Sequence, residues 1–207
     1  MKKVYDTINQ YCVEHELLTN GDGIVIGLSG GMDSVCLLQV LAALRNEWKL
    51  RLVCVHVHHG IRGTAADEDA AFAQRLAAKY NISFRLYEMD IPQLAKEQGL
   101  SEEEAGRNYR YRCFEEVRKE LNFDKIAVAH HRDDQAETVL WQILRGSGLR
   151  GVCGMRAGRA NIIRPLLCLD RQQIEQIVRG NGDGWREDAT NREEKYTRNK
   201  IRNRVFP

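Results

Sequence analysis

The chain has 207 residues, 43% of them hydrophobic, which suffices for one substantial core but leaves little room for two full domains. Its 31 basic and 29 acidic side chains leave a formal net charge of +2, so the overall charge indicates no particular partner. No apolar run approaches the ~20 residues of a membrane span and no signal-like stretch opens the chain, so we expect a cytoplasmic protein that binds no membrane. Six cysteines lack the C-x-x-C spacing, which argues against a zinc site or a cysteine-ligated cluster and fits reduced thiols.

Strand-like and helix-like segments alternate over the first two thirds of the chain. Buried apolar runs predict strands at 23–28, 52–57, 83–89 and 125–129. Helical periodicity predicts helices at 33–46, 64–80, 102–121 and 134–144. The residues of the last helix that should face a core are Val139, Leu140, Ile143 and Leu144. This alternation predicts an α/β fold with an open, mostly parallel sheet and helices on both faces, of the Rossmann-like type.

Beyond residue 146 the sequence becomes richer in glycine and then in basic residues. The string GSGLRGVCGMRAG suits a loop that contacts a ligand, and 162–167 predicts one more strand. Asp170 is the expected N-cap of a helix over 171–179. Five basic residues and no acid lie between 195 and 204. We therefore divide the chain into a globular unit over 1–184 and a short basic helical appendage over 185–207.

The string SGGMDS, from Ser29 to Ser34, follows the first predicted strand and leads into a helix. Ligands bind beyond the carboxyl ends of parallel strands, where Gly30 and Gly31 allow a close backbone approach and the helix N-terminus favours an anion. An acid at Asp33 would repel a phosphate unless a cation lay between them, so we predict Mg²⁺ at Asp33. The alternative is a tight turn in which Asp33 only stabilises the first helical turn.

The complete SGGMDS string resembles the pyrophosphate-binding loop of the ATP pyrophosphatase superfamily. The resemblance implies ATP as cofactor, cleavage between its α and β phosphates, and a fold of the adenine nucleotide alpha hydrolase type. It does not by itself choose the group that receives the AMP. The residues that it implies in phosphate binding are Ser29, Gly30, Gly31, Met32, Asp33 and Ser34.

The string HVHHGIRG ends the second predicted strand and therefore lies on the same edge of the sheet. We expect His56, His59 and Arg62 to form a rim of imidazole and guanidinium groups near the phosphates or the base. A metal site is the less favoured alternative, because no acid stands beside the histidines in sequence and Arg62 would add repulsion. His56 also has a structural alternative, as a hydrogen-bonded histidine at a strand end.

The string EEEAGRNYRYRCF places Glu104, Arg107 and Tyr111 on one helix face, with Arg110 one position behind Tyr111. If this face is directed at the site, Arg107 and Arg110 would neutralise phosphate charge that develops during adenylyl transfer. A solvated, salt-bridged helix face is the alternative.

The string HHRDDQAET follows the fourth predicted strand and returns the chain to the ligand-binding edge. Asp134 and Glu137 stack one turn apart on the next helix, where two carboxylates can grip an ammonium group, hold a metal or act as a base. Alternatively, the pair only complements the positive helix N-terminus. Asp133 is expected to be a cap rather than a ligand.

The final string WREDATNREEKYTRNKIRNRVFP interleaves basic side chains with asparagines. Arg198 and Arg202 suit contact with a phosphate backbone, and salt would weaken such binding steeply. A solvated basic helix is the alternative for this segment.

Together these strings, with LRGSGLRG and RPLL between them, resemble the N-terminal catalytic domain of the tRNA-isoleucine lysidine synthetase family over roughly residues 20–207. The resemblance implies a ligase that uses ATP to adenylate the wobble cytidine of a minor isoleucine tRNA with a CAU anticodon. The ε-amine of free L-lysine then displaces AMP to give lysidine. The implied partners are this tRNA and lysine, and the oligomeric state stays open, with a homodimer as one alternative.

Residue by residue, the resemblance assigns the acidic pair Asp134 and Glu137 to lysine. The arginines that it places against the nucleotide, the cytidine or the tRNA phosphates are Arg107, Arg110, Arg145 and Arg150. His58 stands where the family commonly carries asparagine in H-V-N-H, so contacts on that rim should differ. Family members generally continue into C-terminal domains that grip the tRNA body, and the basic segment of this chain would lead toward such domains. Without them we expect adenylation to survive and discrimination among tRNAs to weaken.

Other functions remain open from the sequence. A tRNA 2-thiocytidine synthetase shares the SGGMDS loop, but its chemistry normally needs paired cysteines. GMP and NAD synthetases share the loop too, yet nothing in their substrates requires a basic tail. A non-catalytic module that binds adenine nucleotides or RNA would be expected to lose Asp33, Asp134 and Glu137, because unused charges cost stability.

Overall fold

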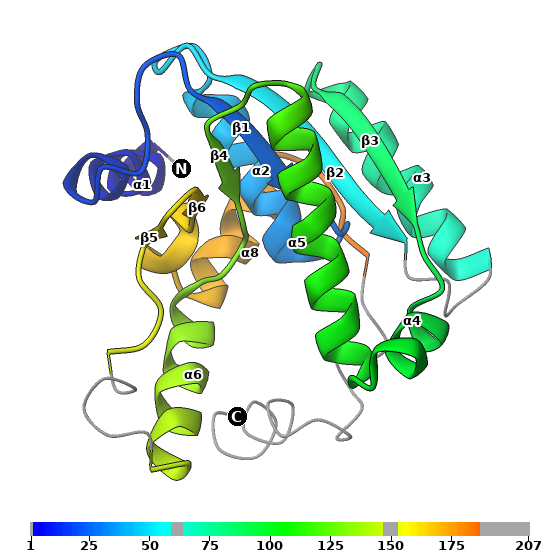
Figure 1. Cartoon of the computed structure of the whole chain (residues 1–207). Helices are drawn as coiled ribbons and strands as arrows, with labels where there is room; N and C mark the ends of the chain where they lie inside the picture. The colour runs from blue at the N-terminus through cyan, green and yellow to red at the C-terminus, as the bar shows by residue number, and fades with distance from the viewer. Residues whose placement is uncertain (1, 59–63, 147–152, 187–207) are drawn as a thin grey trace.

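The computed structural model describes residues 2–58, 64–146 and 153–186 of the chain. Its strands are β1 (Gly23–Gly27), β2 (Arg51–His58), β3 (Ser83–Glu88), β4 (Lys125–Ala127), β5 (Gly158–Arg159) and β6 (Ile162–Ile163). They form one sheet in the order β3-β2-β1-β4-β6-β5 (Figure 1). Every neighbouring pair is parallel except β5 with β6. The predicted open, mostly parallel sheet is therefore confirmed.

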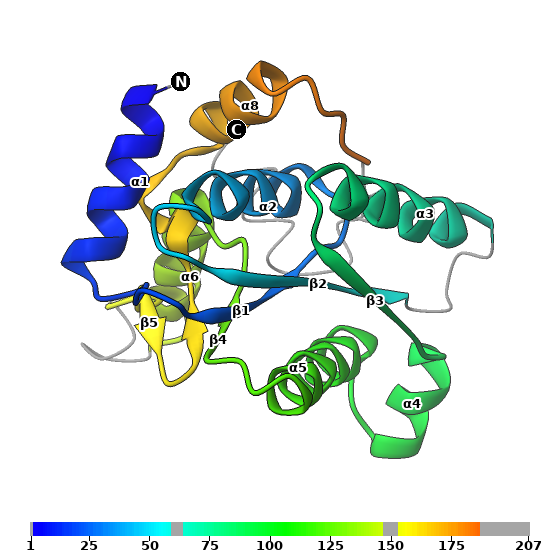
Figure 2. The same ribbon diagram turned by 90° about the horizontal axis from the view of Figure 1, so that it is seen from above.

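Helices cover both faces of the sheet, as predicted. They are α1 (Lys2–Glu14), α2 (Met32–Leu44), α3 (Thr64–Lys79), α4 (Ile91–Gln98), α5 (Glu102–Glu120), α6 (Arg132–Leu144) and α8 (Arg171–Gly180), with a 3-10 turn η1 (Pro165–Cys168). Figure 2 shows α1, α2, α3 and α8 on one face, and α4 and α5 on the other. Within the described ranges, no helix combines the length and the apolar character that crossing a membrane requires.

Two hydrophobic clusters fill the space between the sheet and the helices. In β1, Ile24 and Ile26 belong to the cluster on the α2 face, whereas Val25 belongs to the cluster on the α5 face. This alternation is the two-residue period of a strand. α2 is buried along most of its length, which is why its sequence MDSVCLLQVLAAL is almost continuously apolar. The buried helix fixes the position of the loop that precedes it.

The predicted element boundaries agree with the structure to within two residues over most of the chain. Asp170 caps α8 as predicted, because its side chain accepts a hydrogen bond from the Gln173 amide. The predicted strand over 162–167 is wrong beyond Ile163, since Pro165 has no N–H to donate to the sheet and begins the η1 turn. α1, α4 and β5 are not among the predicted elements.

α6 departs from its predicted packing. Ile143 and Leu144, expected to face a core, are 53% and 68% exposed. Val139 and Leu140 are only partly buried. Figure 1 shows that α6 projects beyond the rest of the described fold, so its C-terminal end lies away from both hydrophobic clusters. The apolar pattern of this helix is thus real, but it does not complete the core.

Candidate active site

The loop after β1 and the start of α6 lie at the same edge of the sheet. β1 and β4 are adjacent parallel strands, with Ile24 beside Lys125 and Ile26 beside Ala127. α2 follows β1 on one face of the sheet, whereas α5, which leads into β4, covers the other face. A change of face between adjacent parallel strands opens a crevice at their carboxyl ends, where α/β sheets bind ligands. The predicted residues of both loops therefore converge there.

Hydroxyl groups within the loop over residues 29–34 fix its shape. The Ser34 hydroxyl accepts a hydrogen bond from the Gly30 amide at 3.1 Å and donates one to the Gly31 carbonyl at 2.9 Å. The Ser29 hydroxyl donates to Ser34 Oγ at 3.1 Å and accepts from the Gly31 amide at 3.3 Å. Gly30 has a φ of +89°, a conformation that favours glycine. The loop is therefore held in shape by its own residues.

The N-terminus of α2 has donors that suit an anion. Gly31 is its N-cap and has no side chain to accept from the first amides of the helix. Asp33 lies in the first turn with its side chain 39% exposed. The helix dipole and the amides attract an anion, whereas the Asp33 carboxylate repels it. This combination suits a phosphate that binds together with a divalent cation.

His131 connects the loop after β1 with the start of α6, although it is not among the predicted site residues. Its Nε2 lies 3.6 Å from Asp33 Oδ2 and 3.5 Å from Asp134 Oδ2, and the residue is 1% exposed. Burial disfavours the charged imidazole, but the hydrogen bond to Asp33 and the charges of Asp134, Asp33 and Asp133 outweigh burial and raise the pKa of His131. One buried imidazole thus contacts carboxylates from the first turns of two helices, α2 and α6.

A capping box positions the predicted acidic pair on α6. His131 is the N-cap and its Nδ1 accepts from the Asp133 amide at 3.3 Å, while Asp134 Oδ2 accepts from the His131 amide at 3.0 Å. The expectation that Asp133 caps this helix is wrong, because the preceding imidazole occupies the N-cap position. Glu137, one turn further on, is 3% exposed. Capping accounts for Asp134 but not for Glu137, which lies beyond the amides that a cap can reach.

The histidine rim predicted after β2 is described only in part. His56 is 5% exposed, and its Nδ1 lies 2.8 Å from the Leu28 carbonyl oxygen. Burial lowers the pKa of His56, so the neutral ring donates to this carbonyl just before the loop. This contact favours the structural alternative for His56, and its contact with a nucleotide stays a prediction. His58 Nε2 lies 3.3 Å from Asp67 Oδ1. His59 and Arg62 lie outside the described residues.

The predicted arginines are exposed where the structure describes them. On α5, Arg107 and Arg110 are exposed, and the Arg107 guanidinium lies 5.2 Å from the centre of the Tyr111 ring. Arg145, just after α6, lies 4.4 Å from the centre of the Trp141 ring. An exposed helix face agrees with both predicted alternatives for α5, phosphate neutralisation and a solvated surface. The remaining predicted arginines, which lie outside the described residues, are Arg150, Arg198 and Arg202.

A segment after α8, residues 183–186, supports the loop from outside and is not predicted as part of the site. The Arg186 amide donates to the Gly30 carbonyl at 2.9 Å, and its guanidinium pairs with Glu68 and Asp69 of α3 at 2.7 and 2.8 Å. Asp183 accepts hydrogen bonds from Gln39, Lys79 and Tyr80. No local pattern marks these contacts, because the Arg186 partners are 117 and 118 residues away in sequence. The division of the chain at residue 184 stays a prediction, since 187–207 are not described.

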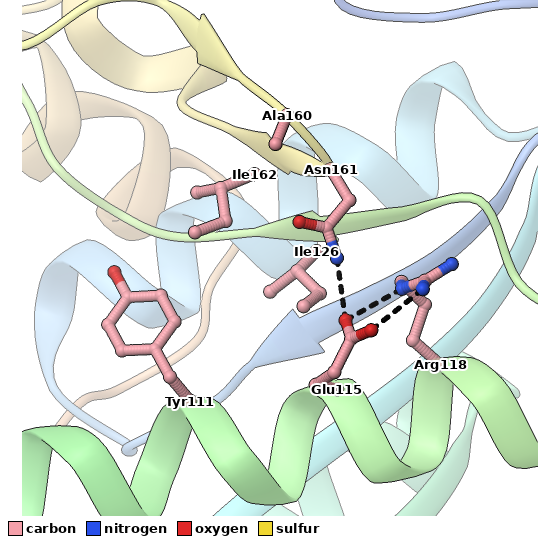
Figure 3. Close-up of a pocket in the computed structure, with 7 residues that line it drawn as sticks. All are labelled: Tyr111, Glu115, Arg118, Ile126, Ala160, Asn161 and Ile162. Carbon is pink, nitrogen blue, oxygen red and sulfur yellow. Dashed lines mark hydrogen bonds and ion pairs between the residues drawn. The ribbon is translucent and has the colours of Figure 1, made fainter.

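A groove of about 450 Å³ lies between α5 and the strands β4 and β6 (Figure 3). At one end Glu115 pairs with Arg118 at 2.8 Å and accepts a hydrogen bond from Asn161 at 2.6 Å. The bond from Asn161 attaches the β5–β6 hairpin to α5, while the Arg118 pair lies within α5. Tyr111 stands at the other end. No predicted site residue is among the residues that line this groove.

Comparisons with known proteins identify the family of this chain. A family model described as the PP-loop domain matches residues 2–207. The tRNA(Ile)-lysidine synthase of Caldanaerobacter subterraneus subsp. tengcongensis is 48% identical over 207 residues, which is 100% of this chain and 44% of that protein. The enzymes of the same name from Clostridium perfringens and Geobacillus kaustophilus are 43% and 36% identical, over 100% and 98% of this chain and 43% and 44% of their own lengths. The chain therefore spans less than half the length of these relatives.

Solved structures share the fold. The U34-tRNA thiolase NcsA from Methanococcus maripaludis, which carries a [4Fe-4S] cluster, has a TM-score of 0.72 at 19% identity, over 89% of this chain and 64% of its own. The NH3-dependent NAD synthetase from Campylobacter jejuni has a TM-score of 0.58 at 18% identity, over 87% of this chain and 73% of its own. At such low identities the likeness supports the fold alone.

Proposed function

The chain belongs to the PP-loop domain family, and on that premise we propose that it is the catalytic part of a ligase that forms lysidine. It binds ATP, adenylates the wobble cytidine of tRNA(Ile) with a CAU anticodon, and joins free L-lysine to C2 of that base. The products are lysidine, AMP and pyrophosphate. The names of the relatives that match the whole chain support this choice of substrates.

The observation that carries the proposal is the shared contact of His131 with Asp33 and Asp134. Carboxylates from the loop after β1 and from α6 approach one imidazole nitrogen at 3.6 and 3.5 Å. A module that only bound nucleotide would need the loop but not the second acid. A two-step enzyme needs both, because it activates one substrate with ATP and then delivers an amine to the same atom.

In the first step, the loop holds the pyrophosphate that leaves. Amides at the α2 N-terminus donate to its oxygens, and the Ser29 hydroxyl turns from Ser34 Oγ to donate there too. The cytidine O2 attacks the α phosphorus, the bond to pyrophosphate breaks, and AMP remains on the base. Arg107 and Arg110 neutralise the charge that develops on the phosphate.

Mg²⁺ fits the donors at this loop. Asp33 offers a partly exposed carboxylate, and Mg²⁺ usually binds one or two carboxylates together with substrate phosphates. Within the described part of the chain, no group of three His, Cys, Asp or Glu side chains could hold a metal without such help. When bound, the ion would screen the phosphates from the Asp33 carboxylate.

In the second step, Asp134 and Glu137 receive lysine. Its ε-ammonium donates to the two carboxylates, which lie one turn apart on α6. The amine has a pKa of ~10.4 in water and must lose a proton before it attacks, so a carboxylate at hand is the natural acceptor. The nitrogen then attacks C2, the C2–O2 bond breaks, and AMP leaves with the oxygen.

The other predicted contacts belong to the same proposal. The residues proposed to complete the nucleotide site are Met32, His56 and His59. The residues proposed to contact the tRNA are Arg62, Arg145, Arg150, Arg198 and Arg202. The proposed location is the cytoplasm, where ATP, lysine and tRNA occur together.

Transfer of labelled lysine to RNA tests the proposal. The chain, and a longer version that continues into C-terminal domains, would be mixed with ATP, Mg²⁺, labelled lysine and tRNA(Ile) carrying CAU. Label should enter this tRNA only with ATP, with AMP formed in equal amount. A methionine tRNA with the same anticodon is the control for selection and should gain less label from the longer version than from the chain alone. If neither version transfers label, the lysidine proposal fails.

A further inference from the structure

Arg164 is a buried cation at the carboxyl end of β6. The residue is 8% exposed. Ile162 packs with the hydrophobic cluster on the α5 face, and Ile163 with the cluster on the α2 face. Arg164 follows β6 directly and precedes η1, at the same edge of the sheet as the candidate active site. Its guanidinium lies near Tyr111 and Arg107 of α5, which both influence its pKa.

The guanidinium of Arg164 lacks a counter-charge among the described residues. Its Nη1 donates to the Arg156 carbonyl at 2.9 Å, but its Nε has no hydrogen-bond partner there. The groups with the largest influence on the pKa of Arg164 are Tyr111, Arg107 and Arg159, and none of them is a carboxylate. Arg118, by contrast, forms an ion pair with Glu115 although it is more exposed. A buried guanidinium with an unused donor costs free energy, which a bound anion would offset.

The groups around Arg164 add positive charge. Burial lowers the pKa of Arg164, Tyr111 opposes this shift, and the charges of Arg107 and Arg159 lower the pKa further. Figure 3 shows Tyr111 standing out from α5 with its hydroxyl pointing away from the helix. The Arg107 guanidinium lies over the same ring. Two guanidinium groups therefore share one tyrosine, and their mutual repulsion favours an anion between them.

We propose that Arg164 and Arg107 bind one phosphate group of the substrate, with Arg164 donating from Nε. Arginine suits this role, because its planar fork of donors matches phosphate oxygens and keeps its charge when buried. The proposal rests on the proposed function for the sources of the phosphate, which are ATP and the RNA backbone beside the wobble cytidine. Both present the same oxyanion, so binding measurements must separate them.

Substitutions at Arg164 separate binding from folding. Arg164→Gln removes the charge, whereas Arg164→Lys keeps it and removes the Nε donor. Arg171→Gln is the matched control, because it removes one exposed arginine from the start of α8, far from the α5 face. Thermal unfolding of each variant identifies a temperature at which all are folded, and affinities are compared there.

The two sources of phosphate are tested in parallel. Calorimetry measures the affinity for ATP with Mg²⁺, and fluorescence anisotropy measures the affinity for an anticodon stem-loop carrying CAU. We expect Arg164→Gln to weaken one of these two affinities roughly ten- to a hundredfold. The corresponding affinity of Arg164→Lys should lie between those of Arg164→Gln and the unaltered chain. If the phosphate belongs to RNA, the salt slope of log affinity also falls by about 0.7. A loss confined to ATP assigns the phosphate to the nucleotide.

Two results would overturn the phosphate site. In the first, Arg164→Gln lowers the unfolding temperature but leaves both affinities equal to those of Arg171→Gln, which makes Arg164 structural. In the second, both affinities are unchanged and only the lysine concentration needed for half-maximal transfer rises. This result would assign Arg164 to the carboxylate of the substrate lysine instead of a phosphate. Neither affinity requires turnover, so failure of this inference is distinguishable from failure of the lysidine proposal.

Discussion

The nucleotide side and the acceptor side of the candidate site differ in how firmly they are built. The loop over residues 29–34 is held by its own serine hydroxyls, by the Arg186 amide and, behind Asp33, by His131. On the acceptor side, Arg145 is exposed and the end of α6 carries Leu144 at 68% exposure. The difference indicates that the chain itself holds the proposed pyrophosphate site in shape, whereas the surface proposed to face RNA is exposed.

Removing the Asp33 carboxylate should give the largest effect. Asp33→Asn keeps the size of the side chain but no longer balances a cation beside the phosphates, so we expect ATP-dependent pyrophosphate release to fall at least ~100-fold. Glu102→Gln is the control, since it removes an acid from the first turn of α5. If both variants change only the stability, by a few tenths to ~1 kcal/mol, Asp33 has only its helix-end role.

His131 should matter through the link that it makes between the two loops. Asn places an acceptor near the Nδ1 position, so His131→Asn keeps the N-cap of α6 but loses the contacts of Nε2 with Asp33 and Asp134. We expect overall lysine transfer to fall roughly ten- to a hundredfold with little loss of stability. In His131→Gln, the side-chain amide reaches the position of Nε2 instead. This variant should therefore transfer lysine faster than His131→Asn. Full activity of His131→Asn would show that the two loops act independently.

Gly30 tests whether the loop must keep its shape to bind nucleotide. A Cβ there would combine a φ of +89° with a contact of 3.4 Å to Phe72 Cδ1. Gly30→Ala should therefore cost about 1–2 kcal/mol in unfolding free energy and also weaken ATP binding. Gly21→Ala is a close control, because Gly21 has a φ of +90° with nothing within 4 Å of the new Cβ. Equal ATP affinities in the two variants would contradict a preformed loop.

The ion pair at the end of the groove should give the smallest effect, on stability alone. The hydrogen bond from Arg118 lowers the pKa of Glu115 to about 2, against an ordinary value of 4.5. A depressed carboxyl pKa stabilises the fold above pH 4.5, and this contribution is lost as the pH falls from 4.5 toward 2. Because the Glu115 side chain is 33% exposed, we expect Glu115→Gln to cost below ~1 kcal/mol at pH 7.

Urea unfolding at pH 7 and pH 3 checks this prediction. The difference in unfolding free energy between the unaltered chain and Glu115→Gln should be smaller at pH 3 than at pH 7. Glu120→Gln, which breaks an exposed pair with Arg85, should cost less. A difference in unfolding free energy that is constant with pH would mean that ionisation of Glu115 does not stabilise the fold.

Most of the fold is predictable because hydrophobic periodicity depends on neighbouring residues. The run at 23–28 and the almost continuously apolar helix after it lie within one window of sequence, and both appear where predicted. α1 carries a weaker signal of the same kind, since the buried residues Ile8 and Cys12 are four positions apart. The predicted strand over 162–167 fails after Ile163 because Pro165 overrides an apolar pattern.

The links within the site are not predictable in this way. Asp33 and Asp134 each follow a strand, which is enough to expect them at one edge of the sheet. That His131 holds both, and that Arg186 supports the loop, depends on contacts between segments far apart in sequence. The available signal for His131 is its position between the fourth strand and an acid-rich helix start. The burial of the Arg164 guanidinium cannot be predicted from the sequence either, because it depends on how β6 packs beside α5.

The most direct test of one site with two successive steps uses Asp134→Asn with α-phosphate-labelled ATP and tRNA(Ile). The Asn side chain can still accept from the His131 amide, so α6 keeps its capping box while the lysine site loses a charge. Asp133→Asn, in the same turn with its side chain 46% exposed, is the matched control. We predict that Asp134→Asn accumulates adenylated RNA and transfers little lysine, while Asp133→Asn behaves as the unaltered chain. Lysine transfer by Asp134→Asn at the unaltered rate, or absence of label on the RNA in every variant, would contradict the account.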